Sequence, residues 1–232
     1  MSKKNITSWE NEDGTTYIGE YWMEEDGDFS RSVPDGKGKM TYPDGAIYWG
    51  DFKNGYPEGF GILKDTNGIF IGQWKEGEPH GKGKQISKEG NSWEGVYING
   101  SLQGLVTHSF KGEILFKGQY KNDVAHGKGV NIEGVGKYRG EIANGLYHGY
   151  GSLAFTDGEL YEGEFLNGSF DGQGSYTFRN GSKWVGEFKD NRMIGEGIFH
   201  TMDGRSELKD WKDDYRNPEG LTILCEKNNF WR

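Results

Sequence analysis

Three histidines that each precede a glycine are the side chains of this sequence best suited to bind a metal. They are His80, His126 and His148, and each is followed directly by Gly-x-Gly. If they occupy equivalent places on β-hairpins, the nearest two lie about 9–10 Å apart, because each hairpin is two strands wide. Zinc holds its ligand atoms at about 2.0–2.1 Å, so the sequence predicts no metal site. We expect a turn-capping role instead. Other polar residues fill the same place elsewhere: Asp35, Glu58, Gln103 and Asp171.

Two glycine–lysine segments resemble phosphate-binding loops. Residues 36–39 and 81–84 both read GKGK. A phosphate cradle needs a glycine-rich backbone that opens into the N-terminus of a helix, whereas the residues after both segments have the pattern of a strand. No serine, cysteine or aspartate stands beside a base in an arrangement typical of nucleophilic catalysis. The sequence therefore predicts no enzyme, no catalytic residue and no cofactor.

The elements that carry these residues are copies of one repeating unit. The clearest copy, residues 161–181, reads YEGEFLNGSFDGQGSYTFRNG. After a longer first interval, the copies recur with a nearly constant period of about 23 residues, which is typical of repeat architectures. Eight copies in a fixed register define a repeat protein. They begin at Tyr17, Tyr48, Phe70, Trp93, Phe116, Tyr138, Tyr161 and Trp184.

The unit Y-x-G-x-[FWY]-x-x-G-x-x-[HDE]-G-x-G resembles the MORN (membrane occupation and recognition nexus) repeat, over residues 15–205. One matching copy has Tyr138, Gly140, Ile142, Gly145, His148, Gly149 and Gly151. Another has Phe70, Gly72, Trp74, Gly77, His80, Gly81 and Gly83. The resemblance implies a protein-interaction, cytoskeletal or membrane-linker module, because the family recurs in scaffolds, regulatory segments and membrane-associated proteins.

Each copy has the pattern of a two-stranded hairpin. Side chains alternate between the faces of a strand, so Tyr161, Gly163 and Phe165 share one face and Glu162 and Glu164 the other. A glycine between two rings leaves bare backbone on which a ring of a neighbouring strand can lie flat. The predicted fold is all-β: an elongated, single-layer, twisted antiparallel meander of tandem β-hairpins with about 16 strands.

The repeat frame divides the chain into three parts. Residues 1–14 are predicted to be a flexible N-terminus, and residues 15–205 form the array, with an insertion at 22–35 in the first copy. Residues 206–232 are a degenerate ninth repeat and a C-terminal cap, which would blunt an open sheet end. The fourth copy has Leu105 and Val106 where a glycine is expected, and the fifth lacks an aromatic residue on its second strand. We expect a kink or a local opening near residues 104–136.

Composition restricts the class of partner and the compartment. The chain has 40 glycines, 5 prolines, a single cysteine and a formal net charge of −9. A negative charge disfavours nucleic acid and anionic lipid as partners. One cysteine cannot form an intramolecular disulfide. Neither a secretory signal nor a membrane-spanning apolar stretch is evident. The predicted location is the cytoplasm, and association with the cytoskeleton or with a membrane surface is a further expectation.

Two surfaces are candidates for binding a partner protein. The first is the aromatic face of the sheet, whose rings either cover one another or leave a groove. For a groove, the predicted contact residues are Tyr138, Phe155, Tyr161, Phe165, Tyr176, Phe178, Trp184 and Phe188. The second is an edge rail of apolar hairpin residues, Pro57, Pro79, Leu102, Ala125, Tyr147, Phe170, Met193 and Ile194. The rail residues either lean inward and staple their own hairpins or form an exposed strip for a partner. In the second case, we expect the bulkier C-terminal members to be exposed.

The leading functional hypothesis is a non-enzymatic scaffold that docks an extended peptide or an amphipathic helix along the groove. One alternative is a membrane- or phospholipid-associated linker. Another is a regulatory subunit of an enzyme on a different chain. The resemblance to the family also implies a homodimer formed through the C-terminal repeats.

Overall fold

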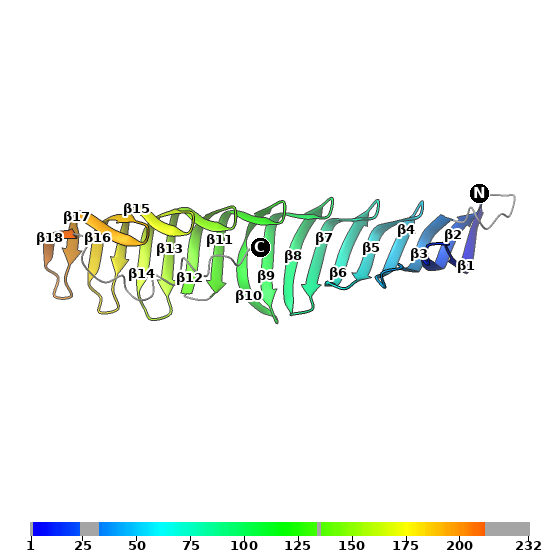
Figure 1. Ribbon diagram of the computed structural model, residues 1–232, viewed down its shortest axis with the longest axis horizontal. Coiled ribbons are helices and arrows are strands. Elements are labelled where there is room, and N and C mark those ends of the chain that lie inside the picture. The colour runs from blue at the N-terminus through cyan, green and yellow to red at the C-terminus, as the bar shows by residue number, and fades with distance from the viewer. Residues whose placement is uncertain (1, 24–32, 134–135, 212–232) are drawn as a thin grey trace. The chain divides into compact units, whose positions relative to one another are not determined.

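The computed structural model describes residues 2–23, 33–133 and 136–211 (Figure 1). The regular secondary structure of these ranges is entirely β-strand, and within each of the two units named below, consecutive strands pair antiparallel. This confirms the predicted class of a single-layer meander of tandem hairpins. The chain divides into two compact units, Met1–Glu113 (unit 1) and Ile114–Arg232 (unit 2). The division falls within the stretch 104–136, where the repeat pattern is weakest. In the described part of the chain, no helix has the length and apolarity that a membrane crossing needs.

The strands of unit 1 follow one another in sequence order. They are β1 (Ser2–Glu10), β2 (Thr16–Met23), β3 (Val33–Thr41), β4 (Ile47–Lys53), β5 (Tyr56–Lys64), β6 (Gly68–Lys75), β7 (Glu78–Ser87), β8 (Asn91–Ile98) and β9 (Ser101–Phe110). Those of unit 2 are β10 (Glu113–Lys121), β11 (Val124–Glu133), β12 (Gly136–Ala143), β13 (Leu146–Phe155), β14 (Leu160–Leu166), β15 (Ser169–Thr177), β16 (Lys183–Lys189), β17 (Arg192–His200) and β18 (Ser206–Trp211).

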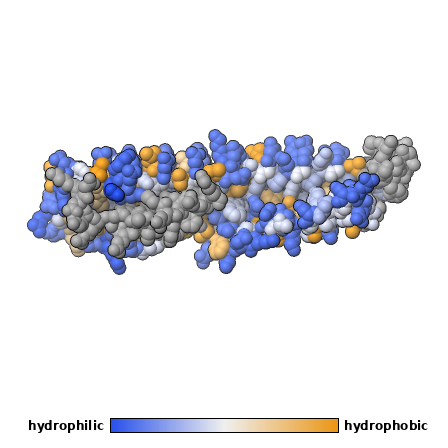
Figure 2. Space-filling view, viewed as in Figure 1, coloured by the Kyte–Doolittle hydropathy of each residue, from blue (hydrophilic) through white to orange (hydrophobic). Residues whose placement is uncertain are grey.

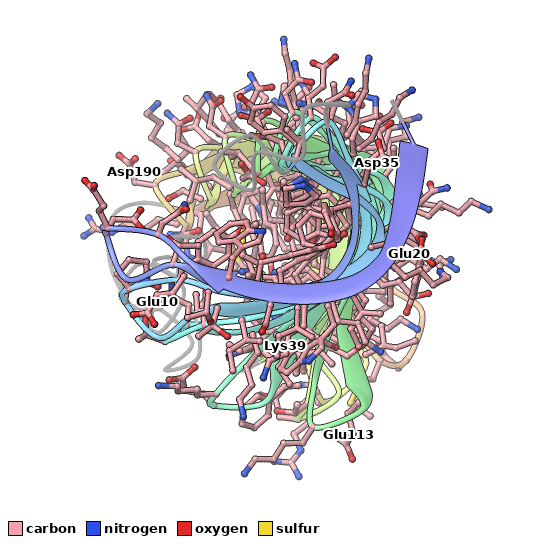
Figure 3. The ribbon with its side chains drawn as sticks, turned by 90° about the vertical axis from the view of Figure 1, so that its right-hand side faces the viewer. Glu10, Glu20, Asp35, Lys39, Glu113 and Asp190 are labelled. Atoms are coloured by element: carbon pink, nitrogen blue, oxygen red, sulfur yellow. The ribbon has the colours of Figure 1, made fainter. Side chains whose placement is uncertain are left out.

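The strands of unit 1 curve, which gives its sheet a concave inner face and a convex outer face (Figure 3). The labelled Glu20 and Lys39 point away from the outer face. Opposite charges pair across neighbouring outer-face strands, as Lys37 does with Asp51 at 2.7 Å. Such exposed pairs contribute little to stability, typically about 0.2–1 kcal/mol. The inner face therefore supplies most of the stabilising contacts.

We number repeat positions from the first aromatic residue, so that Tyr161 is position 1, Phe165 position 5 and Phe170 position 10 of its copy. Positions 7 and 8 form the turn. In the turn after β14, Asn167 and Gly168 both have positive φ angles, 51° and 88°. Two successive positive φ angles define the type I′ turn, whose twist matches that of the strands it joins.

A β-bulge interrupts each hairpin after its turn. In the β14–β15 pair the register shifts between Gly163 and Phe165. Gly172, at position 12 opposite this shift, has a φ of 108°, a conformation that favours glycine. The Glu164 carboxylate at position 4 accepts a hydrogen bond from the Gln173 N–H at 3.1 Å. The bulge therefore explains both the glycine that recurs at position 12 and the carbonyl-bearing side chain at position 4.

The ring at position 1 lies over the glycines at positions 3 and 14 of its own hairpin. Tyr161 donates a hydrogen bond from its hydroxyl to the Glu164 carbonyl at 2.7 Å. A Cβ built on Gly163 would lie 2.6 Å from the Tyr161 Oη, and one on Gly174 would lie 2.7 Å from it. These glycines make room for a ring as predicted, but the expected origin of the ring holds only for Gly174, since the ring over Gly163 comes from its own strand. The ring belongs to the same hairpin, because a position 1 side chain reaches along its own strand and across to the next.

Rings are shared between neighbouring copies on the inner face of each unit. In unit 1, Trp74 lies edge-to-face against Tyr48 of the preceding copy, with ring centroids 5.1 Å apart. In unit 2, Phe165 contacts Tyr138 of the preceding copy at 5.2 Å. Edge-to-face pairs at such distances contribute about 0.5–1.5 kcal/mol each beyond burial. Each copy therefore depends on its neighbours for its core.

Turns of successive copies are also hydrogen-bonded to one another. The Gly55 N–H donates to the Pro34 carbonyl at 2.9 Å. The Glu76 N–H donates to the Glu58 carboxylate at 3.1 Å, and the Asn54 N–H to that of Asp35 at 3.4 Å. These contacts confirm the predicted turn-capping role for Asp35 and Glu58, whereas Asp171 at the same position pairs with Lys189 at 2.8 Å. In the described ranges, no three His, Cys, Asp or Glu residues gather closely enough to hold a metal ion.

Parts of the predicted division of the chain need correction or fall outside the described residues. Residues 1–14 are not simply a flexible end, since Ser2–Glu10 forms β1 and pairs with β2. Ser206–Trp211 of the degenerate ninth repeat forms β18 and pairs with β17. The fourth copy still folds as the hairpin β8–β9, with the buried Val106 side chain in place of a glycine. Most of the insertion 22–35 and residues 212–232 lie outside the described part.

Candidate functional site

The eight residues predicted to line an aromatic groove all belong to unit 2, and the structure brings them together on its inner face. Six of them have an exposed fraction of 3% or less: Tyr138, Tyr161, Phe165, Tyr176, Trp184 and Phe188. Phe155 and Phe178 are half-buried and contact the ring of Tyr176 at centroid distances of 6.1 and 5.2 Å. Most of the predicted contact residues are therefore core residues, and the two at position 18 remain partly accessible.

The predicted edge rail also lies on the inner face. Phe170 stacks on Tyr161 with centroids 3.6 Å apart and an interplanar angle of 8°. Tyr147 stacks on Tyr138 in the same way at 3.8 Å. Leu102, Tyr147, Phe170 and Met193 are buried, and Ile194 is half-buried. The expectation that the bulky C-terminal members are exposed was wrong. Position 10 faces inward, so these side chains staple their hairpins, which is the other alternative that the sequence left open.

The inner face of unit 1 has an open hollow where unit 2 has stacked rings. Its volume is about 510 Å³. Its apolar wall includes Tyr42, Tyr48, Pro57, Leu63 and Trp74. In the view of Figure 2, hydrophilic residues lie along the edges of unit 1, and a band of paler residues runs between them.

A second hollow continues the first along the same face. It has a volume of about 160 Å³ and shares Leu63 and Asp65 with the larger one. Pro79, Gln85 and Tyr97 line its other side. The two hollows together form a groove that crosses several strands of unit 1. We call this pair of hollows the unit 1 groove.

The side chains at positions 10 and 16 explain why this groove is open. In unit 1, position 10 carries Pro57 and Pro79, which are smaller than Phe170 and leave space on the inner face, although the position 1 rings Tyr48 and Phe70 are themselves buried. The neighbouring position 16 carries Leu63, whereas the copy in unit 2 that begins at Tyr161 carries Tyr176 there. The same backbone repeat therefore gives a filled face or a groove according to the size of two side chains.

Two carboxylates line the unit 1 groove, and both are held by turns. Asp44 Oδ1 accepts a hydrogen bond from the Ala46 N–H at 2.9 Å. Asp65 Oδ1 accepts from the N–H groups of Asn67 at 2.7 Å and of Gly68 at 2.9 Å. Such Asx turns fix the side chain to its own backbone. The groove therefore combines an apolar floor with negative charges in fixed places.

The titration of two tyrosines reflects this environment. Burial raises the pKa of Tyr42, and the negative charge of Asp44 raises it further. Burial is also the main reason why the pKa of Tyr48 is raised, with a further contribution from Asp51. Both hydroxyls stay protonated at neutral pH, and the hydroxyl of the buried Tyr48 donates a hydrogen bond to the Asp51 carbonyl at 3.0 Å.

Further along the inner face of unit 1, position 16 is occupied by His108. Its ring stacks on Trp93 with centroids 4.8 Å apart, and its Nε2 lies 3.1 Å from the Asn91 Oδ1. Burial lowers the pKa of His108 below its ordinary value of 6.5. The imidazole is therefore a neutral core group, and the face offers no general acid or base poised beside a nucleophile within the described ranges.

Sequence reasoning expected the groove in unit 2, whereas the two hollows described above lie in unit 1. The predicted contact residues were aromatic residues of unit 2, and most of them are buried. The signal for the groove was nevertheless present, since Pro57 and Pro79 belong to the predicted rail. The asymmetry between small and large residues at that position was the missed feature.

The described ranges consist of tandem hairpins that share rings, and no catalytic group is assembled in them. This architecture defines the class of β-repeat proteins. Comparison with known proteins identifies the repeat. The family model of the MORN repeat matches residues 26–47, 48–69, 70–92, 116–130, 138–159, 161–183 and 184–204. The chain belongs to the MORN repeat family, a class of repeat and binding modules rather than an enzyme family. The unmatched fourth copy is the one in which Leu105 and Val106 break the pattern.

Among curated proteins, Alsin is similar to this chain. The proteins from Rattus norvegicus, Mus musculus and Homo sapiens are each 30% identical to it over 151 residues. The match covers 59% of this chain but only 9% of the length of Alsin. In that relative, the similar repeats are thus a small part of a much longer protein.

Proposed function

We propose that this chain is a non-enzymatic scaffold that binds a segment of a partner protein along the inner face of its repeats, with the unit 1 groove as the main site. The observation that carries the proposal is the apolar groove beside Tyr48 and Trp74. Its larger hollow, of about 510 Å³, is within the range of about 300–1,000 Å³ that is typical of ligand pockets. A ring-lined groove suits an extended peptide or the apolar side of an amphipathic helix.

The aromatic side chains of unit 2 serve two purposes in the proposed scaffold. The buried rings keep the repeat backbone in register, whereas the half-buried Phe155 and Phe178 are the members of the predicted set that a partner can touch. Truncation of Phe178 should therefore weaken a contact without removing a core ring. A cytoplasmic place of action is part of the same proposal.

The proposal is tested by peptide selection and by filling the groove. A random peptide display library is selected on the full chain, and the selected sequences are synthesised and titrated by fluorescence anisotropy. Pro57→Phe copies Phe170 of unit 2, and Leu63→Tyr copies Tyr176, so each should occupy the groove with a ring. Two independent filling variants are used so that the test still gives a result if one of them misfolds. Ile62→Phe is the matched control, because it adds a ring to the same strand on the opposite face.

We expect both filling variants to weaken peptide binding by at least about tenfold, which corresponds to about 1.4 kcal/mol, while the control binds like the wild type. Far-ultraviolet circular dichroism and thermal unfolding verify that each variant is folded. Selected peptides that bind the folded filling variants as tightly as the wild type would refute the groove as the site. Failure to select any peptide would count against the scaffold function itself.

A further inference from the structure

The unit 1 groove has an acidic rim over an apolar floor. Pro57, Leu63 and Trp74 contribute apolar surface, and the carboxylates of Asp44 and Asp65 lie on the same wall. Neither lysine nor arginine is among the described residues that line the larger hollow. A partner side chain that enters the groove therefore meets negative charge and aromatic rings together.

The groove carboxylates differ from those of the outer face in having no cation beside them. On the outer face, Asp51 pairs with Lys37 at 2.7 Å, and Glu162 pairs with Lys183 at 3.7 Å. In the described part of the chain, Asp44 and Asp65 form hydrogen bonds to turn backbone but no ion pair. Their charges are fixed in position and are not compensated by a neighbouring side chain.

The negative charge of Asp44 affects the pKa of a neighbouring tyrosine in the groove. The pKa of Tyr42 is raised by burial and, in addition, by the negative charge of Asp44. The Tyr42 ring, which is half-buried, shares the same hollow. A cation near these groups would gain attraction from the carboxylates and from the face of the ring.

We propose that the unit 1 groove selects a partner segment in which a lysine or arginine stands beside an apolar side chain. The apolar side chain would fill the space over Pro57 and Leu63, and the cation would lie between the carboxylates of Asp44 and Asp65. This inference rests on the proposed function and specifies the chemistry of the partner.

Charge argues against the other occupants of such a groove. A second copy of this chain carries the same net charge of −9, so two copies repel one another at long range. An anionic lipid headgroup or a nucleic acid would bring its own negative charge to the two carboxylates. A basic segment is the class of partner for which the electrostatic energy is favourable at every separation.

The chain provides a matched control for the rim charge. Asp157 occupies a turn of the same kind in unit 2, where its Oδ1 accepts a hydrogen bond from the Glu159 N–H at 3.1 Å. Replacing aspartate by asparagine keeps the Oδ1 acceptor of the turn and removes the charge. Asp44→Asn and Asp65→Asn therefore test the charge of the groove, and Asp157→Asn tests the same chemical change away from it.

The experiment uses the synthetic peptides selected on the full chain, each with a second version in which the basic residue is replaced by glutamine. Affinities for the wild type, for the double variant Asp44→Asn/Asp65→Asn and for Asp157→Asn are measured by fluorescence anisotropy at low and high salt. We expect selected sequences to be rich in lysine or arginine next to an apolar residue. The double variant should weaken them by about tenfold, as should the glutamine substitution, and the two losses should not add. High salt should reduce the affinity for the wild type more than that for the double variant.

The outcomes separate this inference from the proposed function. Suppose that the selected peptides are neutral or acidic and lose affinity with Pro57→Phe but not with Asp44→Asn/Asp65→Asn. This result would support the groove as the binding site and would refute the proposal that the partner segment is basic. Equal losses with Asp157→Asn would overturn it as well, because the effect would then be one of overall charge. Binding to phosphatidylserine vesicles that Pro57→Phe abolishes, in the absence of any peptide binder, would overturn both proposals in favour of a lipid.

Discussion

Gly163→Val is the substitution that most sharply tests how a ring and two glycines organise each hairpin. A Cβ on Gly163 would lie 2.5 Å from the Gly174 Cα, 2.6 Å from the Tyr161 Oη and 2.7 Å from the Gln173 carbonyl oxygen. Two of these three atoms are backbone, so a side-chain rotation cannot relieve the clash. Either β14 separates from β15, or the Tyr161 ring leaves its place.

The size of the effect follows from what the ring does. Tyr161 is fully buried, stacks on Phe170 at 3.6 Å and donates a hydrogen bond to the Glu164 carbonyl. Its displacement should cost nearly as much as removal of a core aromatic side chain, about 3–5 kcal/mol. At a urea m-value of about 2 kcal/mol/M, a loss of about 4 kcal/mol lowers the unfolding midpoint by about 2 M.

Urea unfolding followed by tryptophan fluorescence measures this midpoint, and Glu162→Val is its control. That variant places the same β-branched side chain on the same strand but on the outer face, where it removes an exposed ion pair with Lys183. We expect the free energy of unfolding to change by less than about 1 kcal/mol in the control. Equal shifts for the two variants would show that the faces of the strand have been assigned in reverse.

Three further predictions concern single side chains of the inner face. Tyr161→Phe removes the hydroxyl that donates to the Glu164 carbonyl and should lower the free energy of unfolding by about 1 kcal/mol, read from the urea midpoint; an unchanged midpoint would contradict the role of that hydrogen bond. Phe170→Ala should cost about 3–5 kcal/mol and open a hollow in unit 2, so that its crystal structure should show a groove like that beside Pro57; a face closed by collapsed neighbours would contradict the assignment of position 10. Burial lowers the pKa of His108 below 6.5 in the folded chain, so just below pH 6.5 the imidazole is protonated in the unfolded chain but not in the folded one. The free energy of unfolding should therefore fall as the pH drops from about 7 toward the lowered pKa. His108→Leu, which copies Leu63 at the same position, should flatten this part of the pH profile, and an unaltered slope would contradict the buried neutral state.

The sequence alone was sufficient to predict the hairpins because their determinants are local. Alternation placed Tyr161 and Phe165 on one face, and an Asn–Gly pair such as 167–168 specified a tight turn. The role of Gly163 could be predicted because only hydrogen fits beneath a ring that lies flat on a strand. These rules act within a short stretch of chain, so each copy repeats the same information.

The groove could not be predicted in the same way because it depends on how side chains from different strands fill one face. Phe170 and Pro57 occupy the same repeat position, yet Phe170 stacks on the ring of Tyr161, whereas Pro57 lies in the wall of a hollow. Counting aromatic residues gave no indication of this, since a ring that stacks on another ring removes accessible surface. The strand Ser2–Glu10 was missed for a different reason, because it lies before the first recognisable copy. It pairs with β2, and Trp9 stacks on Tyr17 with ring centroids 5.5 Å apart.

The indole N–H signal of Trp74 provides the most direct test of the claim that the unit 1 groove is where a partner binds. Trp74 lines the larger hollow and donates its N–H to the Gly61 carbonyl at 3.3 Å, whereas Trp184 lies fully buried in unit 2. In ¹H–¹⁵N spectra assigned with Trp74→Phe and Trp184→Phe, titration with a selected peptide should move the Trp74 signal and leave the Trp184 signal in place. A shift of Trp184 alone, with Trp74 unmoved at saturation, would contradict the account.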